Sequence, residues 1–202
     1  MKSKNWLVLL ALVFATQWAS AQSPLIRVRA TITALDGNVL SVKTREGEAI
    51  QINLPDNLSV AGTKNITLAD IKPGDFVGST TVANAKGEMV AMEVHLFTPA
   101  QRGVVREGHF DWDLAPGSQM TNATLNNAPV QTSGGREISL QYKEGAKKII
   151  VPEGIPIFTT VSGDRSLLVP GATIFTAVQQ GADGKLSTAR IQVSKDGARP
   201  AQ

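Results

Sequence analysis

The chain has 202 residues, with 20 Lys and Arg against 17 Asp and Glu, a formal net charge of +3 and no cysteine. The lack of cysteine excludes disulfide bonds, thiolate metal ligands and a cysteine nucleophile. Basic residues are interspersed with acidic ones and do not form a stripe, so no nucleic-acid partner is expected.

The first 21 residues have the three parts of a secretory signal peptide. Lys2 and Lys4 supply the positive charge, residues 6–15 form an apolar run, and small residues precede the expected cleavage between Ala21 and Gln22. No stretch approaches the roughly 20 apolar residues that a membrane-spanning helix needs, so no transmembrane segment is expected in the mature chain. We therefore predict a periplasmic or secreted protein.

Turn-forming residues indicate that the rest of the chain is an internal duplication. The Pro73-Gly74 pair matches the Pro170-Gly171 pair at an offset of 97 residues, and the apolar positions around these turns stay in phase. The predicted parts are a signal peptide (1–21), a first β-barrel domain (22–98), a connector (99–118), a second β-barrel domain (119–195) and a flexible tail (196–202).

Each copy has the alternating pattern of β-strands. Apolar and polar residues alternate over residues 50–54 and 90–96, and in the second copy over residues 189–193. In the strand over 90–96, this pattern turns Glu93 and His95 to the side away from the core, where we expect them to be solvated. About five short strands per copy predict an all-β fold of two tandem small OB-like β-barrels, with a flat sandwich as the alternative.

Two stretches of the first copy carry a resemblance to a known family. Residues 30–42 read ATITALDGNVLSV and residues 68–77 read LADIKPGDFV. Together they resemble a bacterial exported domain family of unknown function with small OB-like β-barrels. In the second copy Ala172 stands where Asp75 would be, so the two copies need not share a ligand. The resemblance implies no catalytic residues, but relatives with two such units are sometimes assigned to metal transport systems.

The residues that common enzyme classes require are missing. The chain has two histidines, His95 and His109, no H-E-x-x-H pair, no S-x-x-K motif and no P-loop. We therefore predict that the protein is not an enzyme and uses no cofactor.

The connector holds the densest group of chemically interesting side chains. If residues 107–114 are extended, alternate residues lie on opposite sides. Aromatic and apolar residues on one side predict a strap that docks on the barrels, and N and O donors on the other side suit a divalent cation. The apolar side has Phe110, Trp112 and Leu114, and the possible metal ligands are Glu107, His109, Asp111 and Asp113.

The favoured interpretation is an exported, non-enzymatic binding or scaffolding protein of the bacterial envelope. Its partner would be an envelope protein or a small ligand, since neither nucleic acid nor a membrane span is expected. The alternative is a periplasmic metal-handling accessory protein of a transport system.

Overall fold

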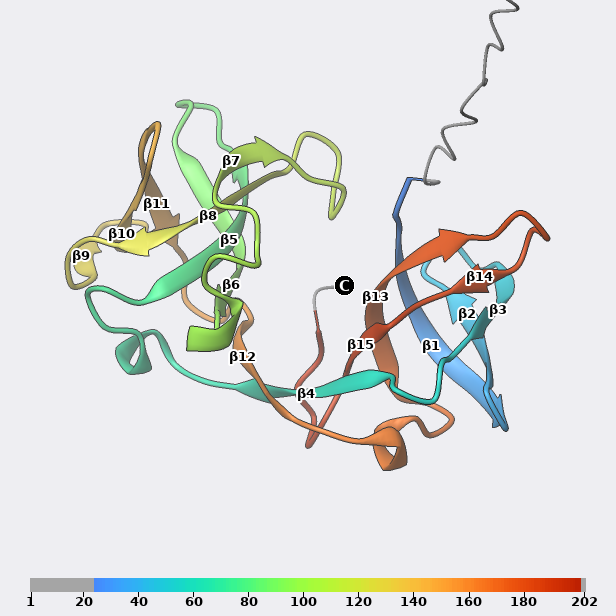
Figure 1. The fold of residues 1–202 in the computed structure, drawn as a ribbon. Coiled ribbons are helices and arrows are strands. Elements are labelled where there is room, and N and C mark those ends of the chain that lie inside the picture. Colours follow the sequence, from blue (N-terminus) through green and yellow to red (C-terminus); the bar gives the residue numbers. More distant parts are fainter. Residues whose placement is uncertain (1–23, 201–202) are drawn as a thin grey trace, which may run out of the picture.

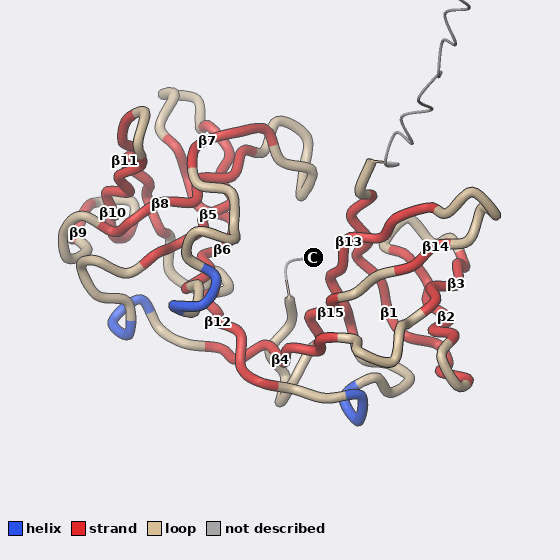
Figure 2. The backbone as a smooth tube through the Cα atoms, viewed as in Figure 1, coloured by secondary structure: helices blue, strands red, loops and turns tan. Residues whose placement is uncertain are grey.

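The computed structural model describes residues 24–200 as an all-β fold, as predicted, with only short 3-10 helices beside the strands (Figure 1). In the first half the strands are β1 (Ile26–Asp36), β2 (Val39–Thr44), β3 (Ala49–Asn53), β4 (Ser59–Asn65), β5 (Phe76–Ala83), β6 (Met89–Leu96) and β7 (Gly108–Asp111). In the second half they are β8 (Gln119–Leu125), β9 (Val130–Thr132), β10 (Gly135–Tyr142), β11 (Gly145–Val151), β12 (Ile157–Ser162), β13 (Thr173–Gln180), β14 (Leu186–Ser187) and β15 (Arg190–Val193). The helices are η1 (Leu68–Asp70), η2 (Pro99–Gln101) and η3 (Arg165–Leu167), drawn blue in Figure 2.

Hydrogen-bonded pairing closes two rings of five strands. The first barrel runs β1–β2–β3–β14–β13 and returns to β1. The second barrel runs β8–β10–β11–β6–β5 and returns to β8. Each ring is mixed, with one parallel pair, β3–β14 or β11–β6. Ring closure excludes the flat sandwich and leaves few free strand edges.

Each barrel takes strands from both halves of the chain. The first core packs Leu40 and Ile52 from the N-terminal half against Ile174 from the C-terminal half. The second core packs Val94 from the N-terminal half against Leu140 from the C-terminal half. Figure 1 shows this exchange in the colours of the sequence, with blue β1 beside orange β13, and in the second barrel β6 of the first half pairs with β11 of the second half. The predicted boundaries, 22–98 and 119–195, therefore do not delimit the two cores.

Strands β4 and β12 carry the chain from one barrel to the other. They pair antiparallel, and Thr63 lies opposite Thr160, an offset of 97 residues. The same offset relates the parallel pair β15–β4 to the parallel pair β12–β6, so the crossing has approximate two-fold symmetry. A Cβ on Gly62 would lie 2.9 Å from the Lys195 side chain and 3.3 Å from that of Val161. Glycine therefore permits the close packing at the crossing.

The two Pro-Gly turns occupy equivalent positions, as predicted from the repeat. Gly74 has φ +92° and Gly171 has φ +88°, both in the region that favours glycine. The amide of Gly74 donates to the Leu125 carbonyl and that of Gly171 donates to the Ile32 carbonyl, each at 2.8 Å. Each turn is therefore bonded to a strand of the other copy.

The C-terminal segment is packed as far as residue 200, which corrects the predicted flexible tail. Lys195 and Ala198 form a β-bridge, and both Ala198 and Pro200 are buried. Arg199 is exposed between them. The backbone of this segment is therefore fixed where it passes between the two barrels (Figure 1).

Candidate functional site

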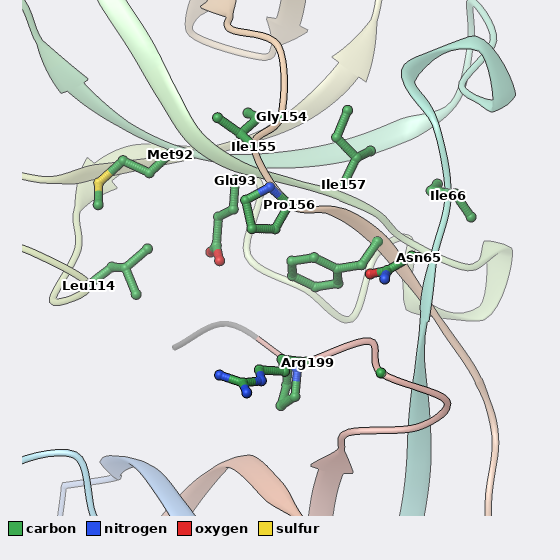
Figure 3. Close-up of a pocket in the computed structure, with 13 residues that line it drawn as sticks. Asn65, Ile66, Met92, Glu93, Leu114, Gly154, Ile155, Pro156, Ile157 and Arg199 are labelled. Carbon is green, nitrogen blue, oxygen red and sulfur yellow. The ribbon is translucent and has the colours of Figure 1, made fainter.

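A cavity of about 500 Å³ lies beside β6, on the side of the second barrel that faces the C-terminal segment. Glu93 of β6 and Arg199 lie on opposite walls (Figure 3). Asn65 at the end of β4 and Phe158 of β12 also line the cavity. The crossing strands and the C-terminal segment together therefore build this cavity.

Glu93 is the buried charged group of the cavity. Its exposed fraction is 6%, and its Oε1 accepts a hydrogen bond of 2.8 Å from the Thr80 hydroxyl. Burial raises the pKa of the Glu93 carboxyl, against the opposing effects of the Thr80 hydrogen bond and the nearby Arg29 charge. In Figure 3 the carboxyl group points into the cavity.

The expectation that Glu93 is solvated is wrong, although the residue is on the side of the strand that the sequence suggested. The pairing of β5 with β6 shifts between Thr80, opposite Glu93, and Thr81, opposite Ala91. This bulge leaves Met92 as an extra residue and breaks the alternation that the sequence suggested. Glu93 does face away from the barrel core, but there the crossing strands and the C-terminal segment cover it.

His95 is also partly buried, contrary to the expectation of a solvated residue. Its ring lies 4.4 Å from that of Phe97 and 4.8 Å from that of Phe158, measured between centroids. The Nε2 atom is buried and has no hydrogen-bond partner among the described residues. This burial lowers the pKa of His95 to about 4, so the imidazole is neutral at physiological pH.

The connector docks on the first barrel after leaving the second. Strand β7 pairs with β8. Beyond it, Asp113 accepts hydrogen bonds from Arg29 at 2.9 Å and from Arg27 at 3.4 Å. Arg45 donates to the Leu114 carbonyl at 2.9 Å, and Arg27 lies 4.2 Å from the centre of the partly buried Trp112 ring. The segment docks as the predicted strap does, but the predicted contacts are only partly present. Leu114 is buried and Trp112 is partly buried, whereas Asp113, on the side expected to be solvated, is paired with two arginines.

We expect Trp112→Ala to lower the free energy of unfolding by about 2 kcal/mol, because it removes a partly buried ring and its cation-π contact with Arg27. For a chain of this size, that loss corresponds to a fall in the melting temperature of roughly 4–8 °C. Trp112→Phe keeps an aromatic ring and is the matched control, with about half the loss. An unchanged melting temperature in Trp112→Ala would show that the contacts of Trp112 do not stabilise the folded protein.

The four predicted metal ligands do not converge. His109 has its Nδ1 atom 2.8 Å from the Thr121 hydroxyl and its Nε2 atom 3.0 Å from the Gln119 carboxamide oxygen. Asp113 is paired with arginines, and both Glu107 and Asp111 are exposed. Within residues 24–200 no three His, Asp or Glu side chains are grouped as a metal ion would need. The predicted cleavage site, Ala21 and Gln22, lies outside the described residues.

A larger cavity of about 730 Å³ lies over β15, β4 and β12. Its walls carry hydroxyl, carboxamide and apolar groups, and Arg190, an exposed residue, is the only charged side chain among the described residues that line it. Because a binding site needs a few fixed polar groups to select its ligand, the smaller cavity with its buried carboxyl is the stronger candidate.

Sequence reasoning missed Glu93, Asn65 and Arg199 as parts of one site. A glutamate and a histidine within the mostly apolar strand over residues 89–96 were the available signal. Nothing in the sequence pattern placed the C-terminal segment opposite that strand.

Residues 24–200 include no helix that is both long enough and apolar enough to cross a membrane. No family model, curated protein or solved structure matches the chain. The functional argument therefore depends on the geometry of the cavity.

Proposed function

We propose that this chain is an exported, non-enzymatic binding protein of the bacterial envelope, built from two copies of an OB-like unit, with its ligand in the cavity beside Glu93. The observation that carries the proposal is a buried carboxyl group that points into a cavity of about 500 Å³. Small-molecule sites have volumes of roughly 300–1,000 Å³ and a few fixed polar groups within apolar walls.

The energetics of Glu93 favour a ligand that brings a hydrogen-bond donor. Burying a carboxylate is costly unless both of its oxygens find partners. Thr80 supplies one partner for Oε1, and among the described residues no hydrogen bond reaches Oε2. A bound molecule with a donor group would supply the hydrogen bond that Oε2 lacks.

The metal-handling alternative has less support. Arg27 and Arg29 engage Asp113, and both ring nitrogens of His109 lie within hydrogen-bond distance of side chains of β8. A cation at these residues would have to displace those contacts. Elemental analysis of the purified mature protein tests this alternative directly.

Ligand binding can be tested by a thermal-shift screen of the mature chain with a small-molecule library and a periplasmic small-molecule extract. A ligand at 100 times its dissociation constant adds about 2.7 kcal/mol, or roughly 5–10 °C in melting temperature. We expect Met92→Trp, which fills the cavity, to abolish that shift. Val130→Trp is the control, because Val130 is 61% exposed on β9. If no compound stabilises the wild-type protein, the proposal fails.

A further inference from the structure

We infer that the ligand of this cavity is a short peptide with free termini, its ammonium group at Glu93 and its carboxylate at Arg199. The inference rests on the proposed function and names the chemical class of the ligand. Oppositely charged side chains on facing walls, with apolar and carboxamide groups between them, are complementary to a dipeptide or tripeptide.

At the Glu93 wall the carboxylate can only accept hydrogen bonds. The positive charge that acts on it within the protein is that of Arg29, and Arg29 is itself engaged by Asp113 at 2.9 Å. Glu93 has no ion pair of its own among residues 24–200. A primary ammonium group is a compact cation with three donors, so it could satisfy the oxygen that Thr80 leaves open.

At the opposite wall Arg199 presents an exposed guanidinium group from a fixed backbone. Buried Ala198 and Pro200 hold the chain on either side of it. Arg199 has no ion pair within the described part of the chain. Guanidinium binds a carboxylate through two parallel hydrogen bonds, which matches the C-terminus of a peptide.

Because Glu93 and Arg199 lie on opposite walls, a ligand that pairs with both must span the cavity of about 500 Å³. An amino acid carries both charged groups on one carbon, whereas each further residue adds about 3.3–3.6 Å of reach. The carboxamide of Asn65 can both donate to and accept from a peptide group. Phe158, Ile155 and Leu114 give apolar walls for small side chains.

Calorimetric titration of the mature protein with matched probes tests this assignment. The probes are Ala-Leu, Ala-Ala-Leu, N-acetyl-Ala-Leu, Ala-Leu-amide and free leucine. We expect Ala-Leu or Ala-Ala-Leu to bind most tightly. Blocking either terminus, or shortening the probe to leucine, should raise the dissociation constant at least tenfold.

Charge-removing variants locate each end of the peptide. Glu93→Gln should bring Ala-Leu and N-acetyl-Ala-Leu to similar affinities, and Arg199→Gln should do the same for Ala-Leu and Ala-Leu-amide. Glu144→Gln and Arg136→Gln remove the same charges at exposed positions outside the cavity and should keep the wild-type order. A merely structural role would weaken all probes equally and would overturn the assignment.

The result also separates this inference from the proposed function. If the screen finds a ligand that Met92→Trp excludes but no peptide probe binds, the peptide assignment is wrong and the binding function stands. Equal affinity for free and blocked termini, or for leucine and Ala-Leu, also overturns the assignment. If neither peptides nor any screened compound binds, both fail.

Discussion

A fragment that ends at residue 98 will not fold into a monomeric barrel. It contains β1 to β3 without β13 and β14, and β5 and β6 without β8, β10 and β11. Both cores would then lack about half of their apolar side chains, among them the partners of Leu40 and Val94. The apolar side chains that remain would be exposed to water. Native domains are stable by only 5–15 kcal/mol, so such a loss exceeds the whole stability. We expect circular dichroism and sedimentation to find an unfolded chain or a dimer that exchanges strands between two copies.

A cut in the full chain is the matched control. A protease site inserted after Gly103, in the exposed connector, breaks the chain between the same two halves after folding. We expect the cleaved protein to stay together and keep its spectrum, because the cut breaks no strand and seven β-ladders join its two pieces. These ladders are β1–β13, β3–β14, β4–β12, β4–β15, β5–β8, β6–β11 and β6–β12. A folded monomer from residues 22–98 alone would contradict the strand exchange.

The repeat and its turns could be predicted from the sequence, but the exchange could not. Pro73-Gly74 and Pro170-Gly171 are visible because the backbone of such a turn restricts which residues fit. A barrel made from β1 to β3 of one copy with β13 and β14 of the other needs the same apolar pattern as a barrel made within one copy. The difference lies in the direction that β4 takes after Leu54, and no local pattern encodes that direction.

The candidate site was hidden from the sequence for related reasons. Glu93 and His95 were placed by simple alternation, which predicted their side of the strand but not what covers that side. The crossing strand β12 packs on both residues, and the C-terminal segment closes the cavity beside Glu93. The strap was easier to predict, because Phe110, Trp112 and Leu114 mark an apolar side by themselves.

His95 should make the protein sensitive to mild acid. The unfolded histidine has a pKa near 6.5, whereas burial lowers the pKa of folded His95 to about 4. The native state therefore binds fewer protons than the unfolded state between these values. The stability from neutral His95 is complete above about pH 6.5 and is lost as the pH falls towards about 4, by a total of about 3 kcal/mol.

Chemical denaturation of the wild type and His95→Leu at pH 7.5, 6, 5 and 4 measures this effect. The free energy of unfolding should fall with decreasing pH more steeply in the wild type, and the difference between the two slopes isolates His95. Burial raises the pKa of Glu93, so Glu93 contributes in the opposite direction and its stabilising effect is lost as the pH rises through its folded pKa. This contribution is present in both proteins and does not affect the difference between them.

His109→Gln is the matched control. Burial and the Lys147 charge also lower the pKa of His109, but its ring is only partly buried and is hydrogen-bonded, so removing it should change the slope less. Parallel pH curves for wild type and His95→Leu would mean that the imidazole is protonated in the folded protein as easily as in water, and the enclosed position of Nε2 between the two phenyl rings would then be wrong.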